Sequence, residues 1–179
     1  MRSLIAAVSV LALAACGEAT TPAAPAPETP AAEAPAASTL PPAAGVKSAD
    51  AAAWSKYVPW KSDLPEVVKT GSGLEYVVLA SGPADGVSPK ANEQAEVYYE
   101  GRLNAGGPAF DSAFERNASA TFPVSAVVPG FSEILQLMKP GDRWLGYLPY
   151  QLAYGAGGKG PIPPAADLIF EVELVSVKP

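Results

Sequence analysis

A segment rich in proline and alanine limits where this chain can fold. These two residue types make up 18 of the 29 residues from Gly17 to Gly45. Such a segment has no periodic apolar face, so it cannot bury enough surface to offset the entropy lost on ordering. Its prolines disfavour a helix despite the many alanines. We therefore expect residues 16–48 to form a disordered, semi-extended tether, and the folded part of the chain to follow it.

The first residues are typical of an export signal. Arg2 precedes the apolar stretch Leu4–Leu13, which is too short to span a bilayer. The run that ends at Cys16 reads Leu-Ala-Ala-Cys and resembles the lipobox of bacterial lipoproteins, in which cleavage leaves the cysteine as the lipid-bearing first residue. An ordinary signal peptide with a chance cysteine is the alternative. We predict a lipoprotein signal peptide over residues 1–15 and lipidation of Cys16.

The same resemblance predicts a location. Gly17 follows the cysteine, where an aspartate would retain lipoproteins of the enterobacterial type in the inner membrane. We therefore expect a protein of the bacterial cell envelope that is lipid-anchored in the outer membrane and faces the periplasm.

The composition excludes several kinds of chemistry. The chain has no histidine and one cysteine, so a Ser-His-Asp triad, a Cys-His pair and a zinc site of Cys and His ligands all lack their parts. Asp and Glu outnumber Lys and Arg by 18 to 12, which argues against a nucleic-acid partner. No spacing of residues is typical of metal ligands. We expect neither a cofactor, nor a metal, nor a nucleic-acid partner.

The remaining sequence predicts strands and one helix. Residues 74–79 and 95–99 alternate like half-buried strands, and further strands are expected at 143–148 and 168–177. An apolar stripe at i, i+3, i+4 and i+7 begins at Phe131 and predicts a short helix that ends before Pro140. The predicted fold is α+β: a curled antiparallel β half-barrel wrapped on one short α-helix, over residues 71–179.

Two acids on the last predicted strand need an interpretation. Glu171 and Glu173 alternate with apolar residues, so they share one face of the strand. They could form a carboxylate pair for acid-base chemistry, but we expect a solvated outer face instead.

Residues 49–70 form an N-terminal extension. The spacing of Trp54, Tyr57 and Val58 predicts a short helix over residues 51–58, stopped by Pro59. We expect Trp54 and Trp60 to pack on the domain; an exposed surface for a partner is the alternative. Nothing here is long enough for a helical dimerisation arm, so a monomer is expected.

A set of apolar and aromatic residues recurs in order through the last part of the chain. It comprises Tyr99, Phe110-Asp111-Ser112, Phe122, Val127-Val128-Pro129-Gly130-Phe131, Ala153-Tyr154-Gly155, Ile162-Pro163-Pro164 and Phe170. In order, spacing and flanking residues, the chain from about Gly71 to Pro179 resembles the FKBP-type peptidyl-prolyl cis-trans isomerases. The family fold is the one that the strand and helix pattern predicts independently.

The resemblance implies a prolyl pocket and a role for each residue in it. Phe131 would be the floor, Tyr154 and the Val128 amide would donate hydrogen bonds to substrate carbonyls, and Asp111 would lie at the edge with Arg116 as its ionic partner. The expected catalytic residues are Asp111, Tyr154, Phe131 and Val128, and the expected substrate-binding residues are Tyr99, Phe110, Phe122, Val127, Ile162 and Phe170. For any one apolar residue alone, core packing is the simpler explanation.

The implied activity is isomerisation of X-Pro bonds in exported polypeptides. A peptide-binding chaperone module with weak or lost isomerase activity is the alternative, because the family most often has tryptophan where this chain has Phe131. The resemblance also implies binding of macrolide inhibitors, and the same difference at Phe131 affects the expected affinity for them. We predict a mobile flap over the pocket for the glycine-rich residues 155–160.

Overall fold

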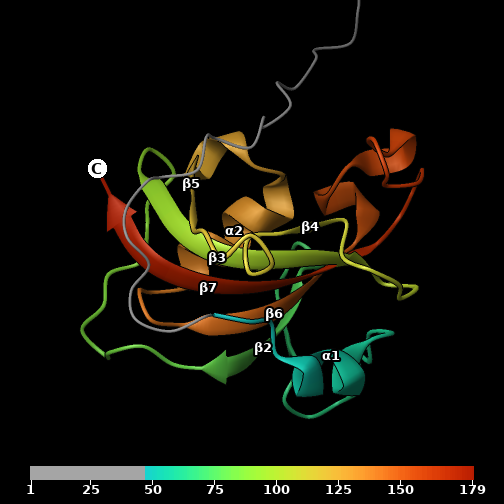
Figure 1. Cartoon of the computed structure of the whole chain (residues 1–179), viewed down its shortest axis with the longest axis horizontal. Coiled ribbons are helices and arrows are strands. Elements are labelled where there is room, and N and C mark those ends of the chain that lie inside the picture. Colours follow the sequence, from blue (N-terminus) through green and yellow to red (C-terminus); the bar gives the residue numbers. More distant parts are fainter. Residues whose placement is uncertain (1–46) are drawn as a thin grey trace, which may run out of the picture. The chain divides into compact units, whose positions relative to one another are not determined.

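The computed structural model describes residues 47–179, so the predicted signal peptide, Cys16 and most of the predicted tether lie outside the described residues. Seven strands in this part of the chain form one open antiparallel sheet (Figure 1). They are β1 (Val68–Lys69), β2 (Glu75–Ala80), β3 (Gln94–Leu103), β4 (Asp111–Ser112), β5 (Ala120–Pro123), β6 (Arg143–Leu148) and β7 (Leu168–Lys178). The strand order is β1-β2-β6-β7-β3-β4, with β5 also paired to β3. The predicted antiparallel α+β fold is confirmed.

Helix α2 (Pro129–Leu137) covers one face of the sheet. Pro129 occupies the first helical turn, where a missing backbone donor costs nothing. The predicted stripe is buried, with Phe131, Ile134 and Leu135 at most 4% exposed. The helix approaches β6 closely at Gly146, where a Cβ would lie 2.5 Å from Cδ1 of Ile134. A larger residue there would force the buried Ile134 side chain to move, so glycine lets the helix lie close to the sheet.

The N-terminal extension covers part of the other face. Helix α1 (Ala51–Tyr57) begins at Asp50, whose carboxylate accepts hydrogen bonds from the amides of residues 52 and 53. Trp54 and Tyr57 are buried in a second apolar cluster, which includes Val77, Leu145 and Ile169. The helix and the packing of Trp54 confirm the prediction.

The second tryptophan of the extension also packs on the sheet. The ring of Trp60 stacks on Tyr147 of β6 at 5.8 Å, and its indole nitrogen donates to Glu75 at 2.7 Å. Strand β1 then joins the sheet beside β2. Residues 49–70 therefore fold together with the domain rather than apart from it. No helix within residues 47–179 combines the length and apolar character that crossing a bilayer requires.

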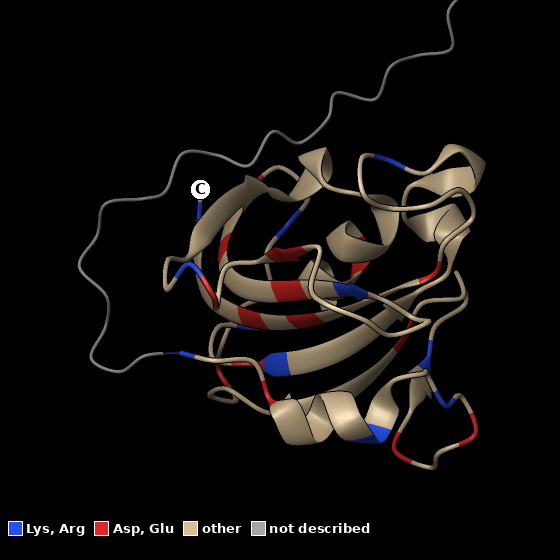
Figure 2. Cartoon of the chain, turned by 45° about the vertical axis from the view of Figure 1, so that its right-hand side comes forward, with Lys and Arg blue, Asp and Glu red and all other residues tan. Residues whose placement is uncertain are grey.

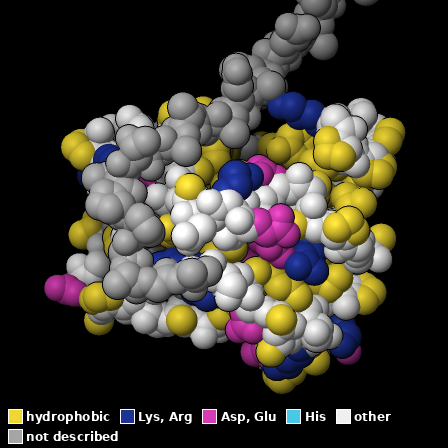
Figure 3. All heavy atoms as spheres, in the orientation of Figure 1, with side chains coloured by type: hydrophobic (Ala, Val, Ile, Leu, Met, Phe, Trp, Pro, Cys, Tyr) yellow, Lys and Arg dark blue, Asp and Glu magenta, His cyan; other side chains and the backbone are white. Residues whose placement is uncertain are grey.

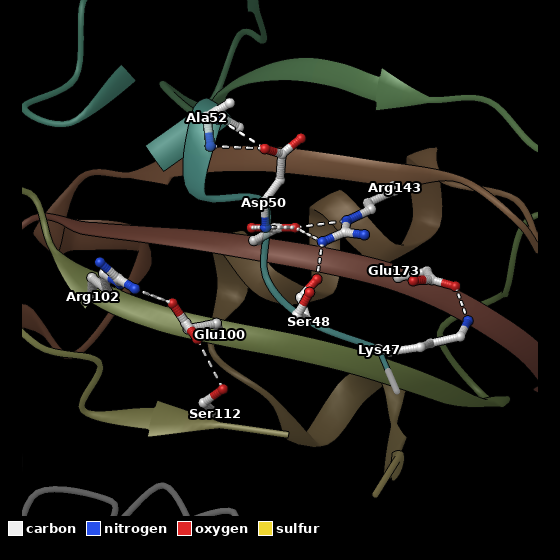
Figure 4. Close-up of polar contacts among 11 residues, drawn as sticks. Lys47, Ser48, Asp50, Ala52, Glu100, Arg102, Ser112, Arg143 and Glu173 are labelled. Atoms are coloured by element: carbon white, nitrogen blue, oxygen red, sulfur yellow. Dashed lines mark hydrogen bonds and ion pairs between the residues drawn. The ribbon is translucent and has the colours of Figure 1, made fainter. Parts of the chain in front are cut away.

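The predicted solvated face of β7 is wrong. Glu171 is 0% exposed, and the first five residues of β7 are all buried. Residues 47–50, which we call the N-terminal strap, lie over this face (Figure 4). Alternation along a strand shows which residues share a face, but it does not show whether that face is covered.

The strap is held by charged side chains of β6 and β7. The backbone amide of Asp50 donates to both carboxylate oxygens of Glu171, at 3.0 and 2.9 Å. Arg143 pairs with Glu171 and donates to the Ser48 carbonyl at 2.6 Å. Lys47 pairs with Glu173. In Figure 2 acidic residues appear as red bands on neighbouring strands of the sheet. The last two residues assigned to the tether, Lys47 and Ser48, thus contact the sheet.

Candidate functional site

Five aromatic rings meet edge to face between the sheet and helix α2. We call this set the aromatic cluster: Tyr99 from β3, Phe110 just before β4, Phe122 from β5, Phe131 from α2 and Phe170 from β7. Phe131 is its centre, with ring centroids 5.1 Å from Phe170, 6.1 Å from Tyr99 and 6.3 Å from Phe122. Phe110 lies 5.6 Å from Phe170. Tilted rings at these distances attract one another through their quadrupoles.

The strand register explains how these rings fit. Phe170 of β7 pairs with Gly101 of β3 on one side and with Gly146 of β6 on the other. A Cβ at Gly101 would lie 2.5 Å from the ring of Phe110 and 2.6 Å from that of Phe170. Glycine at this position therefore leaves the space that the two rings occupy.

The structure brings the other predicted apolar residues to the same cluster. Val127 and Val128 are partly buried at the start of α2, and both pack against the core that contains the five rings. Ile162 is 6% exposed and belongs to that core. A short bridge to Lys159 holds it in the loop that follows the 3-10 helix η3 (Gly155–Gly157). Every apolar residue assigned to the pocket thus belongs to this one core or packs against it.

Asp111 lies beside the cluster and is held by two partners. The Tyr99 hydroxyl donates to Oδ2, and Nη1 of Arg116 donates to Oδ1. The guanidinium also donates from Nη2 to the Tyr99 hydroxyl at 3.2 Å, which closes a triangle of polar groups. Burial, together with the hydrogen bond to Asp111, raises the pKa of Tyr99 well above its usual range. Tyr99 therefore keeps its proton at neutral pH.

Tyr154 presents a second phenol at this edge. It follows the 3-10 helix η2 (Tyr150–Leu152) and packs against the same core. Burial, and the charge of Asp111, raise its pKa, so its hydroxyl is also protonated at neutral pH. Within residues 47–179 this hydroxyl makes no hydrogen bond, and the Lys159 ammonium lies 5.8 Å from the ring centroid. Tyr154 is therefore free to donate to a bound molecule.

The Val128 amide is a further donor without a partner in the described part of the chain. Val128 is the N-cap of α2, and the first amides of a helix have no intrahelical acceptor. The arrangement combines an apolar aromatic surface, a fixed carboxylate and two free donors. Such a site suits a neutral, partly apolar ligand with carbonyl groups.

Two polar residues behind the cluster were given no role in the sequence analysis. Glu100 and Ser112 are each 3% exposed and hydrogen-bond to each other at 3.0 Å. The sequence signal for Glu100 was an acid placed between Tyr99 and Gly101.

Comparison with known proteins identifies relatives of this chain. The family model of FKBP-type peptidyl-prolyl cis-trans isomerases matches residues 86–175. The chain is 48% identical over 115 residues to the peptidyl-prolyl cis-trans isomerase Mip of Coxiella burnetii, which covers 64% of this chain and 49% of the relative. It is 45% identical over 119 residues to the macrophage infectivity potentiator of Trypanosoma cruzi, covering 66% of this chain and 60% of that protein. The chain thus spans about half the length of these curated relatives.

Solved structures agree with these relatives. The structure of FkpA from Escherichia coli superposes with a TM-score of 0.62 at 36% identity, covering 66% of this chain and 54% of the other. A peptidyl-prolyl cis-trans isomerase from Pseudomonas syringae superposes with a TM-score of 0.60 at 34% identity, covering 66% of this chain and 85% of that one.

Proposed function

Because this chain belongs to the family of FKBP-type peptidyl-prolyl cis-trans isomerases, we propose that it accelerates rotation about X-Pro bonds in exported polypeptides. The observation that carries the proposal is the aromatic cluster, with Phe131 at its centre and free donors at its edge. The relatives named above as isomerases support the same reaction.

The reaction needs little chemical machinery. Amide resonance opposes rotation with a barrier of about 18–20 kcal/mol, and no bond is made or broken. A catalyst has only to bind the twisted amide better than either planar form. The twisted amide has lost resonance and much of its carbonyl dipole, so an apolar surface favours it over the planar ground states. Lowering the barrier by about 5–6 kcal/mol gives roughly four decades in rate.

The residues of the site divide this work. Phe131, Phe122, Phe170 and Tyr99 would surround the proline ring, with Phe110, Val127 and Ile162 completing the apolar wall. Tyr154 and the Val128 amide would hold the carbonyls on either side of the bond.

Because the pKa values of Tyr99 and Tyr154 are raised, both phenols stay protonated at neutral pH. Asp111, fixed by Tyr99 and Arg116, would keep the edge of the site in position.

Replacing Tyr154 or Asp111 should reduce catalysis and leave the fold intact. Tyr154→Phe removes one donor, and Asp111→Leu removes the carboxylate, while neither leaves a large cavity. We expect each change to lower kcat/KM by about tenfold, which corresponds to about 1.4 kcal/mol. Exchange NMR on an X-Pro peptide measures the rate, and thermal unfolding checks the fold. Turnover at the wild-type rate in both variants would remove these residues from the mechanism.

The same assay separates the proposed isomerase from a peptide-binding module. A wild-type chain that binds the peptide but leaves the rotation rate at its value in buffer would overturn the proposed activity.

We further propose that Cys16 carries a lipid that anchors the chain in the outer membrane, facing the periplasm. The Leu-Ala-Ala-Cys run and the proline-rich tether support this location. Relatives named as an outer membrane protein of Legionella longbeachae and as Mip proteins suggest a cell-envelope setting.

Cys16→Ser should release the protein from membranes without changing its isomerase activity. The reason is that the lipid would be attached at the start of the tether, many residues before the aromatic cluster. Membrane fractionation measures the first effect, and intact-mass analysis of the wild-type chain tests for acylation at Cys16. A serine variant that still pellets with membranes would contradict anchoring through Cys16. A soluble wild-type chain that begins at another residue would indicate an ordinary signal peptide.

A further inference from the structure

A chain of polar contacts that includes two buried side chains runs along the face of the sheet opposite the aromatic cluster. Its centre is Glu100 of β3, which is 3% exposed. Oε1 of Glu100 accepts from Nε of Arg102 at 2.8 Å and pairs with Nη2 at 2.6 Å. Oε2 accepts from the hydroxyl of Ser112 at 3.0 Å. Figure 4 shows Glu100 between its two partners, with Ser112 on the neighbouring strand β4.

Ser112 connects this chain to the turn that carries Arg116. Its hydroxyl oxygen accepts from the amide of Glu115 at 3.1 Å, and its carbonyl accepts from the amide of Arg116 at 3.4 Å. The guanidinium of Arg116 then donates to both Asp111 and Tyr99. Ser112 is therefore linked by hydrogen bonds to the turn whose Arg116 contacts the Asp111 carboxylate.

The backbone of β4 provides few hydrogen bonds that could hold Asp111 in place. The strand has two residues, which pair with Glu100 and Gly101 of β3. On either side of β4, the Phe110 amide donates to the Gly101 carbonyl at 2.9 Å and the Ala113 amide donates to the Tyr99 carbonyl at 2.8 Å. A strand this short has little resistance to displacement, so the side-chain bond between Glu100 and Ser112 adds an anchor where the backbone provides little.

Arg102 extends the chain of contacts to the N-terminal extension. Its guanidinium lies 4.6 Å from the ring centroid of Trp54 in helix α1, a cation-π contact. On the face of the molecule shown in Figure 3, acidic and basic side chains lie next to each other. A buried carboxylate is costly unless it is paired and hydrogen-bonded, and an apolar residue of similar size would often stabilise the fold at least as well. Stability alone thus does not account for Glu100.

We infer that Glu100 is a positioning residue for Asp111, acting through Ser112 and the turn that carries Arg116, and that Arg102 of β3, which lies against Trp54 of helix α1, holds Glu100 in place. The inference rests on the proposed isomerase function. In this view, residues on the face of the sheet that the N-terminal extension covers help to determine the catalytic efficiency of the site on the opposite face.

The test compares Glu100→Ala, Ser112→Ala and the double variant in the full chain. Each single change should lower kcat/KM by about tenfold, because a displaced catalytic group loses its productive geometry. The double variant should be no slower than either single one, since both act through one chain of contacts. In the background of Asp111→Leu, Glu100→Ala should have no further effect on kcat/KM. A purely structural role would give the same loss in both backgrounds, and that result would overturn the inference.

Two further variants keep the test decisive. Glu96→Ala is the matched control, because Glu96 is a buried acid on the same strand that bonds instead to Ser119, Ser176 and Lys178. It should lower thermal stability without changing kcat/KM, and a tenfold loss there would overturn the inference. Glu100→Gln keeps the volume and an acceptor for Ser112. It replaces Glu100→Ala if the alanine variant does not fold. Glu100→Gln should lower kcat/KM by less than Glu100→Ala does, and this loss should also vanish in the Asp111→Leu background.

A separate measurement distinguishes failure of this inference from failure of the proposed function. The ¹³C chemical shift of the Asp111 carboxyl carbon reports its surroundings without any assay of isomerisation. Glu100→Ala should move this signal, and Glu96→Ala should not. A wild-type chain without isomerase activity would refute the proposed function, whereas an unmoved Asp111 signal in Glu100→Ala would refute the positioning role.

Discussion

Phe170→Ala is expected to lower the free energy of unfolding by about 3–5 kcal/mol and to remove most of the isomerase activity. The ring is 5% exposed and packs against Phe110 and Phe131, with centroids 5.6 and 5.1 Å away. Truncation leaves a cavity between α2 and the sheet and separates two rings of the aromatic cluster. Chemical denaturation measures the stability, and exchange NMR on an X-Pro peptide, well below the melting temperature, measures the activity.

Leu174→Ala is the control for this prediction. Leu174 lies on the same face of β7, is fully buried and is not one of the five rings. It should lose a comparable amount of stability, about 2–5 kcal/mol for a buried leucine, and keep its kcat/KM. If Phe170→Ala retained the wild-type kcat/KM, the ring would serve the core alone.

Glu171→Ala is expected to lower the free energy of unfolding by about 3–5 kcal/mol, because it leaves the guanidinium of Arg143 without its buried partner. It also removes the acceptor for the Asp50 amide, so the N-terminal strap loses its central attachment. Hydrogen exchange at the Asp50 amide should accelerate along with the loss of stability.

Glu173→Ala tests whether burial is the cause. The Glu173 side chain is 18% exposed and, among residues 47–179, pairs only with Lys47, itself 32% exposed. A pair of this kind contributes about 0–1 kcal/mol, so the variant should remain close to wild-type stability. Equal losses in the two variants would contradict the reasoning from burial.

Much of the site was predictable from residue order. Tyr99, Phe131 and Phe170 recur at spacings typical of the family, and the structure brings all three rings together. The helical stripe from Phe131 to Met138 was also visible, since apolar residues at a 3.6-residue period must share one side of a helix. Local periodicity and motif order can both be read from a single sequence, so these features could be predicted without the tertiary structure.

The two faces of the sheet were not equally predictable. Local pattern determined that Phe170 and Glu171 point to opposite faces, because side chains alternate along any strand. It did not determine that both faces are covered, one by α2 and the other by α1 and the N-terminal strap. The outcome depends on where a segment more than a hundred residues earlier in the chain comes to rest. Tertiary structure alone decided that Glu171 is buried. Arg143 and the Asp50 amide meet its carboxylate there and offset part of the cost of removing it from water, while burial still raises the pKa of Glu171.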